Sequence, residues 1–425
     1  MKKVLVMTLL VLMLAVFAAC GNNGDDAADN TLTIWCWDPA FNVFAMQEAA
    51  AIFQRANPDV EINIIEVDWY DIQTAIITAA TANQLNTLPD IMLIQDNAFQ
   101  MHVMSFPEVF IDLTDSGINF NEFATAKAGM SMVNGRNFGV PFDNGTTIGA
   151  FRTDILAQAG LTIDDFTDVT WNEFIDLGRI VLAETGMPMI STVAGGGDYI
   201  NFMIQSAGAS VFNPDGTPNI AGNPAIIEAV NIFQELVAAG VLLEVNNWDE
   251  YIGSFVNGTV AGTIAGCWIL GSIQTATDQA GNWAVTNVPR LNIPSGTNYS
   301  NWGGSSWAVT SNAANPDLAI DFLNYTFAGS VELYDIILPA AGALSTWAPA
   351  AASVVYQEPQ PFFGGQTVFS DIIRFSGNVP SVTTGVFFYE ARDAIGFAVV
   401  NILGGADMTQ ELQAAQDQVL FQMGQ

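Results

Sequence analysis

The sequence is poor in positive charge: 10 Lys and Arg stand against 43 Asp and Glu, giving a formal net charge of -33 at pH 7. Such a chain repels nucleic acid and anionic lipid, so binding to DNA, RNA or a membrane through a basic surface is excluded. A single histidine, His102, and three cysteines leave little for zinc chemistry or a histidine-based catalytic triad. Lys127 is the only lysine after position 3, which argues against Schiff-base catalysis. We expect His102 to be an ordinary polar helix residue.

What the chain does have is length and apolar content. Its 425 residues allow two or three domains, and 50% of them are hydrophobic. The aromatic fraction of 11% is also that of a folded protein. A disordered acidic tail is therefore excluded despite the charge.

The N-terminus has the features of a bacterial targeting signal. Lys2 and Lys3 precede an apolar stretch, residues 4–17, that is too short for a permanent membrane-spanning helix. The stretch ends in Phe17-Ala18-Ala19-Cys20, which resembles a lipobox, although Phe17 stands where an aliphatic residue is usual. The alternative is an ordinary secretory signal with an incidental cysteine.

The lipobox interpretation divides this end of the chain into two parts. Residues 1–19 form the signal peptide, and Cys20 becomes the lipidated first residue, carrying palmitate. Residues 20–30, which are acidic and rich in Asn and Gly, form a flexible tether. The protein is then anchored by lipid to the extracellular face of the bacterial cell membrane.

Two cysteines remain in the rest of the chain, Cys36 and Cys267, each directly before a tryptophan. In an oxidising compartment they could form a disulfide. Two small buried thiols are the interpretation that we favour.

Short strands alternate with amphipathic helices in the first part of the body. We expect strands at 31–35, 60–67 and 90–94, with helices at 43–56 and 70–83 between them. The strand at 90–94 is continuously apolar, as in a parallel sheet covered on both faces. The fold class is therefore α/β.

Three further helices are indicated by their capping residues. The capping box Thr170-Trp171-Asn172-Glu173 opens a helix that ends near Gly186. Asn-Pro pairs open two more helices, at 223–240 and 315–329, each followed by glycine.

Seven segments, in order along the chain, resemble one family. They are IWCWDPAFN, ANPDVEI, LPDIMLI, FGVPFDNG at 138–145, RTDILAQAG before TWNEF, FVNGTVAGTIAGCW at 255–268, and GGSSWAVTSNAANPDLAIDFLNY at 303–325. Together these segments resemble extracellular solute-binding proteins of the sugar-binding (family 1) type. These are the lipoproteins that capture ligand for ATP-driven importers, in the wider group of maltose-binding protein.

The resemblance implies a two-lobed periplasmic-binding-protein-like fold with the ligand in the cleft between the lobes. We expect 31–142 plus 303–328 to form the N-terminal lobe, and 143–302 plus 329–425 the C-terminal lobe. It further implies a monomer that needs no cofactor or metal and catalyses no reaction. The partners are a sugar, the ABC permease and its ATPase subunits, the last two on separate chains.

Sugar recognition needs flat aromatic rings against the C–H faces of the pyranose and carboxylates or amides against its hydroxyls. We expect such side chains after strands, at the lobe crossings and in glycine-rich loops, because open α/β sheets bind ligands at the carboxyl ends of their strands. At each of these positions, core packing or turn capping is the competing interpretation. The candidates are Trp37, Asp38, Asp96, Asp143, Asp198, Tyr199, Trp268, Trp302 and Trp347. In the family that the chain resembles, the tryptophan matching Trp268 stacks on sugar.

Other functions remain open at this point. A surface-anchored carbohydrate hydrolase would use two carboxylates, but with 43 acidic residues some pairs occur by chance. A binding protein for a peptide or polyol, or a sensor, would have the same fold. An anionic ligand is disfavoured because Arg136, Arg152 and Arg290 are the only basic residues expected near the cleft.

Overall fold

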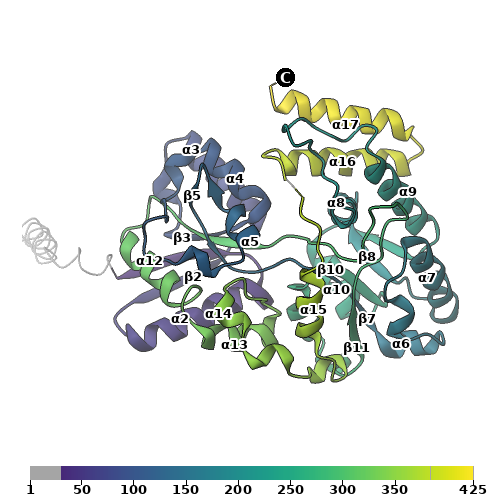
Figure 1. Cartoon of the computed structure of the whole chain (residues 1–425), viewed down its shortest axis with the longest axis horizontal. Helices are drawn as coiled ribbons and strands as arrows, with labels where there is room; N and C mark the ends of the chain where they lie inside the picture. The colour runs from purple at the N-terminus through teal and green to yellow at the C-terminus, as the bar shows by residue number, and fades with distance from the viewer. Residues whose placement is uncertain (1–29, 383, 425) are drawn as a thin grey trace, which may run out of the picture.

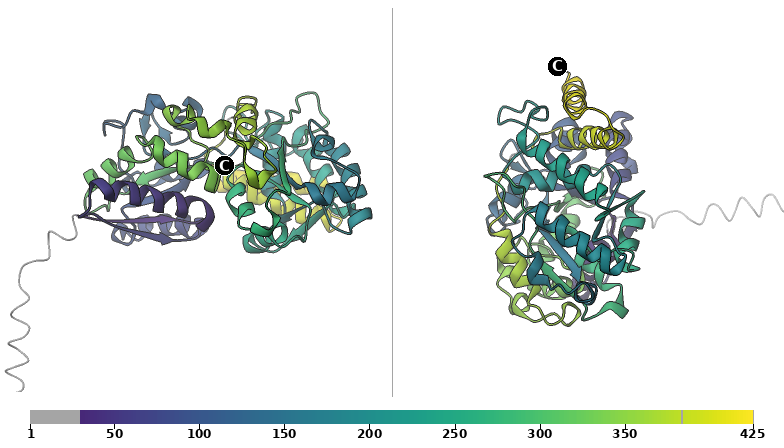
Figure 2. Two further views of the ribbon diagram at one scale, coloured as in Figure 1. Left: turned by 90° about the horizontal axis from the view of Figure 1, so that it is seen from below. Right: turned by 90° about the vertical axis from the view of Figure 1, so that its right-hand side faces the viewer.

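The computed structural model describes residues 30–382 and 384–424. The expected signal peptide, Cys20 and nearly all of the tether lie outside the described residues. The described chain is an α/β protein with two lobes side by side, each with its own β-structure (Figures 1 and 2). No helix in the described part is long and apolar enough to cross a membrane.

The first lobe is built on a five-stranded sheet. In sheet order its strands are β2 (Glu61–Glu66), β1 (Thr31–Cys36), β3 (Ile91–Gln95), β12 (Ser305–Val309) and β6 (Val140–Pro141). β1 runs parallel to β2 and β3, whereas β12 is antiparallel to β3 and β6. The continuous apolar run predicted a strand buried on both faces, and Ile91 to Ile94 are indeed all buried.

Helices cover this sheet on both sides. They are α2 (Phe44–Ala56), α3 (Trp69–Thr81), α4 (Asp96–Ser105), α5 (Thr125–Met130), α12 (Pro316–Tyr325), α13 (Val331–Ala341) and α14 (Ala348–Ala351), with a small hairpin of β4 (Met132–Val133) and β5 (Arg136–Asn137). The predicted Asn-Pro start of α12 is confirmed: the Asn315 side chain caps the helix by accepting from the Leu318 N–H.

The second lobe has two small sheets. One places β7 (Thr147–Arg152) between β10 (Gly262–Gly266) and β11 (Trp283–Thr286), and the other pairs β8 (Ile190–Val193) with β9 (Leu242–Val245). Its helices are α6 (Thr153–Gln158), α7 (Trp171–Thr185), α8 (Gly197–Ser206), α9 (Pro224–Ala238), α10 (Trp248–Val256), α11 (Ile269–Gln274), α15 (Val368–Ser376), α16 (Phe388–Leu403) and α17 (Met408–Gln422). The predicted capping box on α7 is confirmed, and α7 ends before left-handed Gly186.

Two segments that cross between the lobes lie against each other. Thr146 forms an antiparallel bridge with Asn301, and the Trp302 N–H donates to the Gly145 carbonyl at 2.7 Å. A Cβ on Gly145 would lie 2.5 Å from the Trp302 carbonyl oxygen, so only glycine permits this approach. Asp143 also bridges to Ser345, which brings a later segment to the same place.

The two cysteines of the described chain, Cys36 and Cys267, are buried and free. Burial raises the pKa of the Cys36 thiol to about 12, so this thiol stays protonated and unreactive. The favoured interpretation as two buried thiols is therefore confirmed. His102 lies in α4, as expected of a helix residue, and its side chain is fully buried.

Candidate ligand-binding cleft

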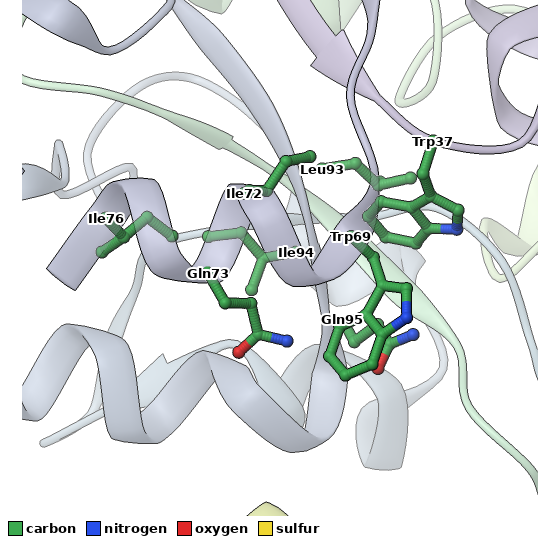
Figure 3. Close-up of a pocket in the computed structure, with 8 residues that line it drawn as sticks. All are labelled: Trp37, Trp69, Ile72, Gln73, Ile76, Leu93, Ile94 and Gln95. Carbon is green, nitrogen blue, oxygen red and sulfur yellow. The ribbon is translucent and has the colours of Figure 1, made fainter. Parts of the chain in front are cut away.

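A cavity of about 1250 Å³ is lined by residues of both lobes. This volume exceeds the usual range for small-molecule sites, about 300–1,000 Å³. A second recess lies behind it, framed by Trp37 and Trp69 together with side chains of α3 and β3 (Figure 3). That recess has no room for even a water molecule, so it is packing behind the cavity wall and not a ligand site.

The first lobe contributes the residues that follow its parallel strands. Trp37 and Asp38 come directly after β1, and Gln95 ends β3, so all three line the cavity as neighbours at one sheet edge. The Asp38 carboxylate accepts from the Ala40 N–H at 3.0 Å. Burial, reinforced by the Glu66 carboxylate, raises the pKa of Asp38, and that N–H opposes the shift.

The second lobe contributes a group of tryptophans. Trp268 lies with its ring 5.5 Å from Trp248 and 6.0 Å from Trp302, the latter edge-on. Its indole N–H donates to the Trp302 carbonyl at 3.0 Å, which fixes the ring against the crossing segment. A Cβ on Gly266 would lie 2.1 Å from that indole nitrogen, so the small residues before Trp268 make room for its ring.

Two predicted carboxylates line the cavity but are engaged by the protein itself. Asp96 forms a buried ion pair with Lys127, and its other oxygen accepts from the Ser306 hydroxyl at 3.0 Å. Asp143 accepts from the Ser305 N–H at 2.8 Å and from its hydroxyl at 2.6 Å. Desolvation raises the pKa of Asp96 to about 6, with Lys127 opposing and Asp143 adding to the shift. These two residues therefore hold the cavity floor together.

Tyr199 and Trp347 do not line the cavity. Tyr199 is fully buried, and its hydroxyl donates to the Ser191 and Ile264 carbonyls at 3.3 Å. It follows Asp198 by about 100° around α8, so Asp198 reaches the cavity while Tyr199 enters the core. Trp347 is buried, and its indole N–H donates to Glu122 at 2.9 Å. Both side chains therefore pack inside the protein, as in the competing core-packing interpretation of these positions.

The charges around the cavity are predominantly negative. Two cations line it, and each is matched by carboxylates: Lys127 by Asp96, and Arg392 by Asp198 and Asp393. The three arginines expected near the cleft lie elsewhere, so that expectation was wrong. They are Arg136, paired with Asp112 and Asp115; Arg152, paired with Asp154; and Arg290, bound to the Asp168 carbonyl. An anionic ligand is still disfavoured, because each cation in the described cavity lining is already paired with a carboxylate.

Residues 48–357 match the family of bacterial extracellular solute-binding proteins. The chain belongs to this family. A lactose-binding protein of Rhizobium radiobacter is 39% identical over 392 residues, which cover 92% of this chain and 93% of that protein. An arabinooligosaccharide-binding protein of Bacillus subtilis (strain 168) is 20% identical, with 94% of each chain covered.

Solved structures confirm the two-lobed fold of this solute-binding protein. One is an ABC transporter associated binding protein of B. animalis subsp. lactis in complex with beta-1,6-galactobiose, with a TM-score of 0.77 at 20% identity, covering 93% of this chain and 97% of that one. Another is the galacto-N-biose-/lacto-N-biose I-binding protein of Bifidobacterium longum, with a TM-score of 0.75 at 19% identity and the same coverage.

The lining of this solute-binding protein also includes aromatic and charged residues that are not among the sequence-based candidates, notably Trp69, Trp248, Tyr389 and Arg392. Trp69 lies soon after the carboxyl end of β2, just as Trp37 follows β1, so its position in the sequence is the signal that indicates it. Trp248 begins α10, where it stands among acidic residues. Tyr389 and Arg392 carry no such signal, because their partners in the first lobe lie about 300 positions away in the sequence.

Proposed function

We propose that this extracellular solute-binding protein captures an uncharged oligosaccharide in the cleft by closure of its lobes and delivers it to an ABC-type permease. The observation that carries the proposal is the pairing of aromatic rings and oxygen-bearing side chains from both lobes around one cavity of about 1250 Å³. The rings suit the C–H faces of sugar residues, and the carboxylates and amides suit their hydroxyls. The sugar ligands of the relatives support the same class.

The ligand contacts that we propose come from both sides of the cleft. Trp37 and Asp38 belong to the first lobe, and Asp198, Trp268 and Trp302 to the second or to the crossing segments. Closure brings the two sets onto one ligand, which is then buried from solvent. Asp96 and Asp143 are proposed to act from beneath, by fixing the floor on which these side chains stand.

The division of the chain into two lobes is also part of the proposal. Hydrophobic packing supports an end of the first lobe later in the sequence than the expected residue 328. The side chains of Leu333, Tyr334 and Ile337 on α13 lie in the same hydrophobic cluster as Leu32 and Ile34 of β1. We therefore propose that the first lobe extends beyond residue 328 to include α13 and α14. The last two helices, α16 and α17, pack on the second lobe, as expected.

The ligand class is tested by a thermal-shift screen of the full chain. The sugars are lactose, galactobiose, maltose and arabinooligosaccharides, with short peptides and polyols as controls. A ligand at about a hundred times its dissociation constant adds about 2.7 kcal/mol of stability, a shift of several degrees. A response to one sugar class without turnover supports the proposal. A response to peptides or polyols alone overturns the sugar assignment, and hydrolysis of a bound sugar overturns the binding-only assignment.

The lipid anchor at Cys20 is a separate part of the proposal. The Cys20→Ser variant should appear in the soluble fraction, whereas the natural chain fractionates with membranes. An unchanged membrane fraction for the variant would mean that something other than Cys20 holds the protein there. Sugar binding by the released variant should be unaltered, since Cys20 precedes the folded lobes.

A further inference from the structure

Helix α16 contacts both lobes within about two turns of its N-terminal end. Ala391, Ala394 and Ile395 are buried in the main hydrophobic cluster of the second lobe. Tyr389, two residues before Ala391, packs instead against a first-lobe cluster that includes Met92. Figure 1 shows this end of α16 directed toward α3 and α4 across the space between the lobes.

The Tyr389 side chain makes two contacts with the first lobe. Its hydroxyl donates to the side-chain oxygen of Gln95, the last residue of β3. Its ring lies 5.5 Å from the Trp69 ring at an interplanar angle of 36°. Both partners are first-lobe residues that line the cavity, Gln95 at the end of β3 and Trp69 at the start of α3, so the contact joins the two walls of the cleft directly.

Arg392, three residues later on the same side of α16, completes the junction. Its guanidinium carbon lies 4.6 Å from the Tyr389 ring centroid and 5.5 Å from that of Trp69. One guanidinium nitrogen lies 3.4 Å from a carboxylate oxygen of Asp198, which is on α8 of the second lobe. The Arg392 side chain is only 15% exposed. A cation held by a second-lobe carboxylate is thus presented to an aromatic face of the first lobe.

We propose that Tyr389 and Arg392 form an interlobe clasp with Gln95 and Trp69, which holds the lobes together before ligand enters. The clasp requires no ligand atom, because protein groups satisfy both sides of each contact. Its consequence for affinity rests on the proposed function: a protein already biased toward closure binds a ligand of the closed state more tightly. Closure itself is measurable without any ligand.

The test is the interlobe distance in the unliganded protein. Nitroxide labels at Gln84→Cys, beside α3, and Gln418→Cys, on α17, report the separation by double electron–electron resonance in the full chain carrying Cys20→Ser. Cys36 and Cys267 are buried and stay unlabelled. Tyr389→Phe keeps the ring but removes the hydroxyl that reaches Gln95. The matched control is Tyr334→Phe, which removes a hydroxyl that donates to the Phe327 carbonyl within one lobe at 2.9 Å.

We expect the distance distribution of Tyr389→Phe to shift to longer separations and that of Tyr334→Phe to remain as in the parent. Gln95→Leu should give the same shift as Tyr389→Phe, and the double variant no further shift, since both remove one contact. Arg392→Gln should also lengthen the separation. Unchanged distributions in Tyr389→Phe and Arg392→Gln, with both variants folded by circular dichroism, would overturn the clasp.

Ligand measurements separate this inference from the proposed function. A saturating sugar should return Tyr389→Phe to the short separation, with affinity about fivefold weaker than that of the parent. A weaker affinity with an unchanged unliganded distance would mean that Tyr389 only contacts ligand, which overturns the clasp. If no sugar binds the parent, the proposed function fails while the unliganded distances still decide the clasp.

Discussion

The Asp143 carboxylate accepts two hydrogen bonds from Ser305, one from its N–H at 2.8 Å and one from its hydroxyl at 2.6 Å. The Ser305 carbonyl in turn accepts from the Lys127 ammonium at 2.8 Å. Asp143 lies on the first segment that crosses between the lobes, and Ser305 lies at the end of the second. The pair therefore ties together the two crossing segments about which we propose that the lobes move.

This relationship changes the effect expected of Asp143→Asn. If Asp143 contacted the ligand directly, the substitution would remove most of the ligand affinity. Because Asp143 instead joins the crossing segments, the substitution should lower the free energy of unfolding by about 1–3 kcal/mol, with a smaller loss of affinity. Urea unfolding and calorimetric titration measure the two effects. Asp321→Asn on the exposed face of α12 is the control, expected within about 0.5 kcal/mol of the parent. A large loss of affinity at unchanged stability would mean that Asp143 contacts the ligand directly.

Trp268 is the residue on which the proposed ligand stacking depends most. Trp268→Ala should weaken sugar binding about tenfold or more, because a platform of the cavity wall is removed. Trp268→Phe should lose less, since it keeps an aromatic face but not the N–H that donates to the Trp302 carbonyl at 3.0 Å. Titration calorimetry gives both affinities. Equal affinities in the parent and the alanine variant would remove Trp268 from the site.

Local sequence rules predicted the elements well where the cause of the element is itself local. The strands expected at 31–35 and 90–94 are found at Thr31–Cys36 and Ile91–Gln95. The helix expected after Thr170 begins there, because its cap and the Glu173 that completes it lie within one turn. Trp37 and Asp38 were found for a related reason: the end of a parallel strand fixes where the next residues lie.

The same rules did not predict the site where it depends on the direction of a side chain or on a partner far away in the sequence. Asp198 and Tyr199 are neighbours, yet Asp198 reaches the cavity and Tyr199 enters the core. The run of glycines before them does not indicate which face of the helix each residue occupies, so the sequence could not distinguish the two. Arg392 is held by Trp69, over 300 positions earlier, and no local pattern encodes that contact. Asp96 lines the cavity, but no local pattern indicates that its ion-pair partner is Lys127, which lies 31 positions later.

Trp347 provides a test of the boundary of the site. It was a candidate from its sequence context, but its indole N–H donates to Glu122 at 2.9 Å inside the first lobe. Trp347→Phe should lower the free energy of unfolding by about 1–2 kcal/mol, through the lost hydrogen bond and reduced packing. Sugar affinity should stay that of the parent, as measured by calorimetry alongside Trp268→Phe. A drop in affinity that exceeds the drop for Trp268→Phe would place Trp347 within reach of the ligand.

His102 makes the stability of the first lobe sensitive to acid. Its imidazole Nε2 lies 2.8 Å from the side-chain oxygen of Gln73, which lines the recess of Figure 3, so the contact joins α4 to α3. Among the described residues the other ring nitrogen, Nδ1, is buried and has no partner. Burial lowers the pKa of His102 from 6.5 to about 4.

The sign of the pH effect follows from this lowered pKa. Between pH 6.5 and 4 the unfolded chain binds a proton at His102 that the folded protein does not, so acid favours unfolding. The contribution of His102 is complete above pH 6.5 and is lost as the pH falls toward 4, by about 3 kcal/mol in all. Asp96 acts in the opposite direction over the same range, because its pKa is raised to about 6 and protonation favours its folded form.

The two effects are separated by removing His102. His102→Gln abolishes the titrating group but leaves Asp96 intact, so lowering the pH should destabilise the variant less than it destabilises the parent. Urea unfolding at intervals from pH 7 to pH 4 should show the parent losing its advantage over the variant as the pH falls. Parallel curves for the two proteins would mean that His102 binds its proton equally well in the folded and unfolded states, so that solvent or a counter-ion reaches Nδ1.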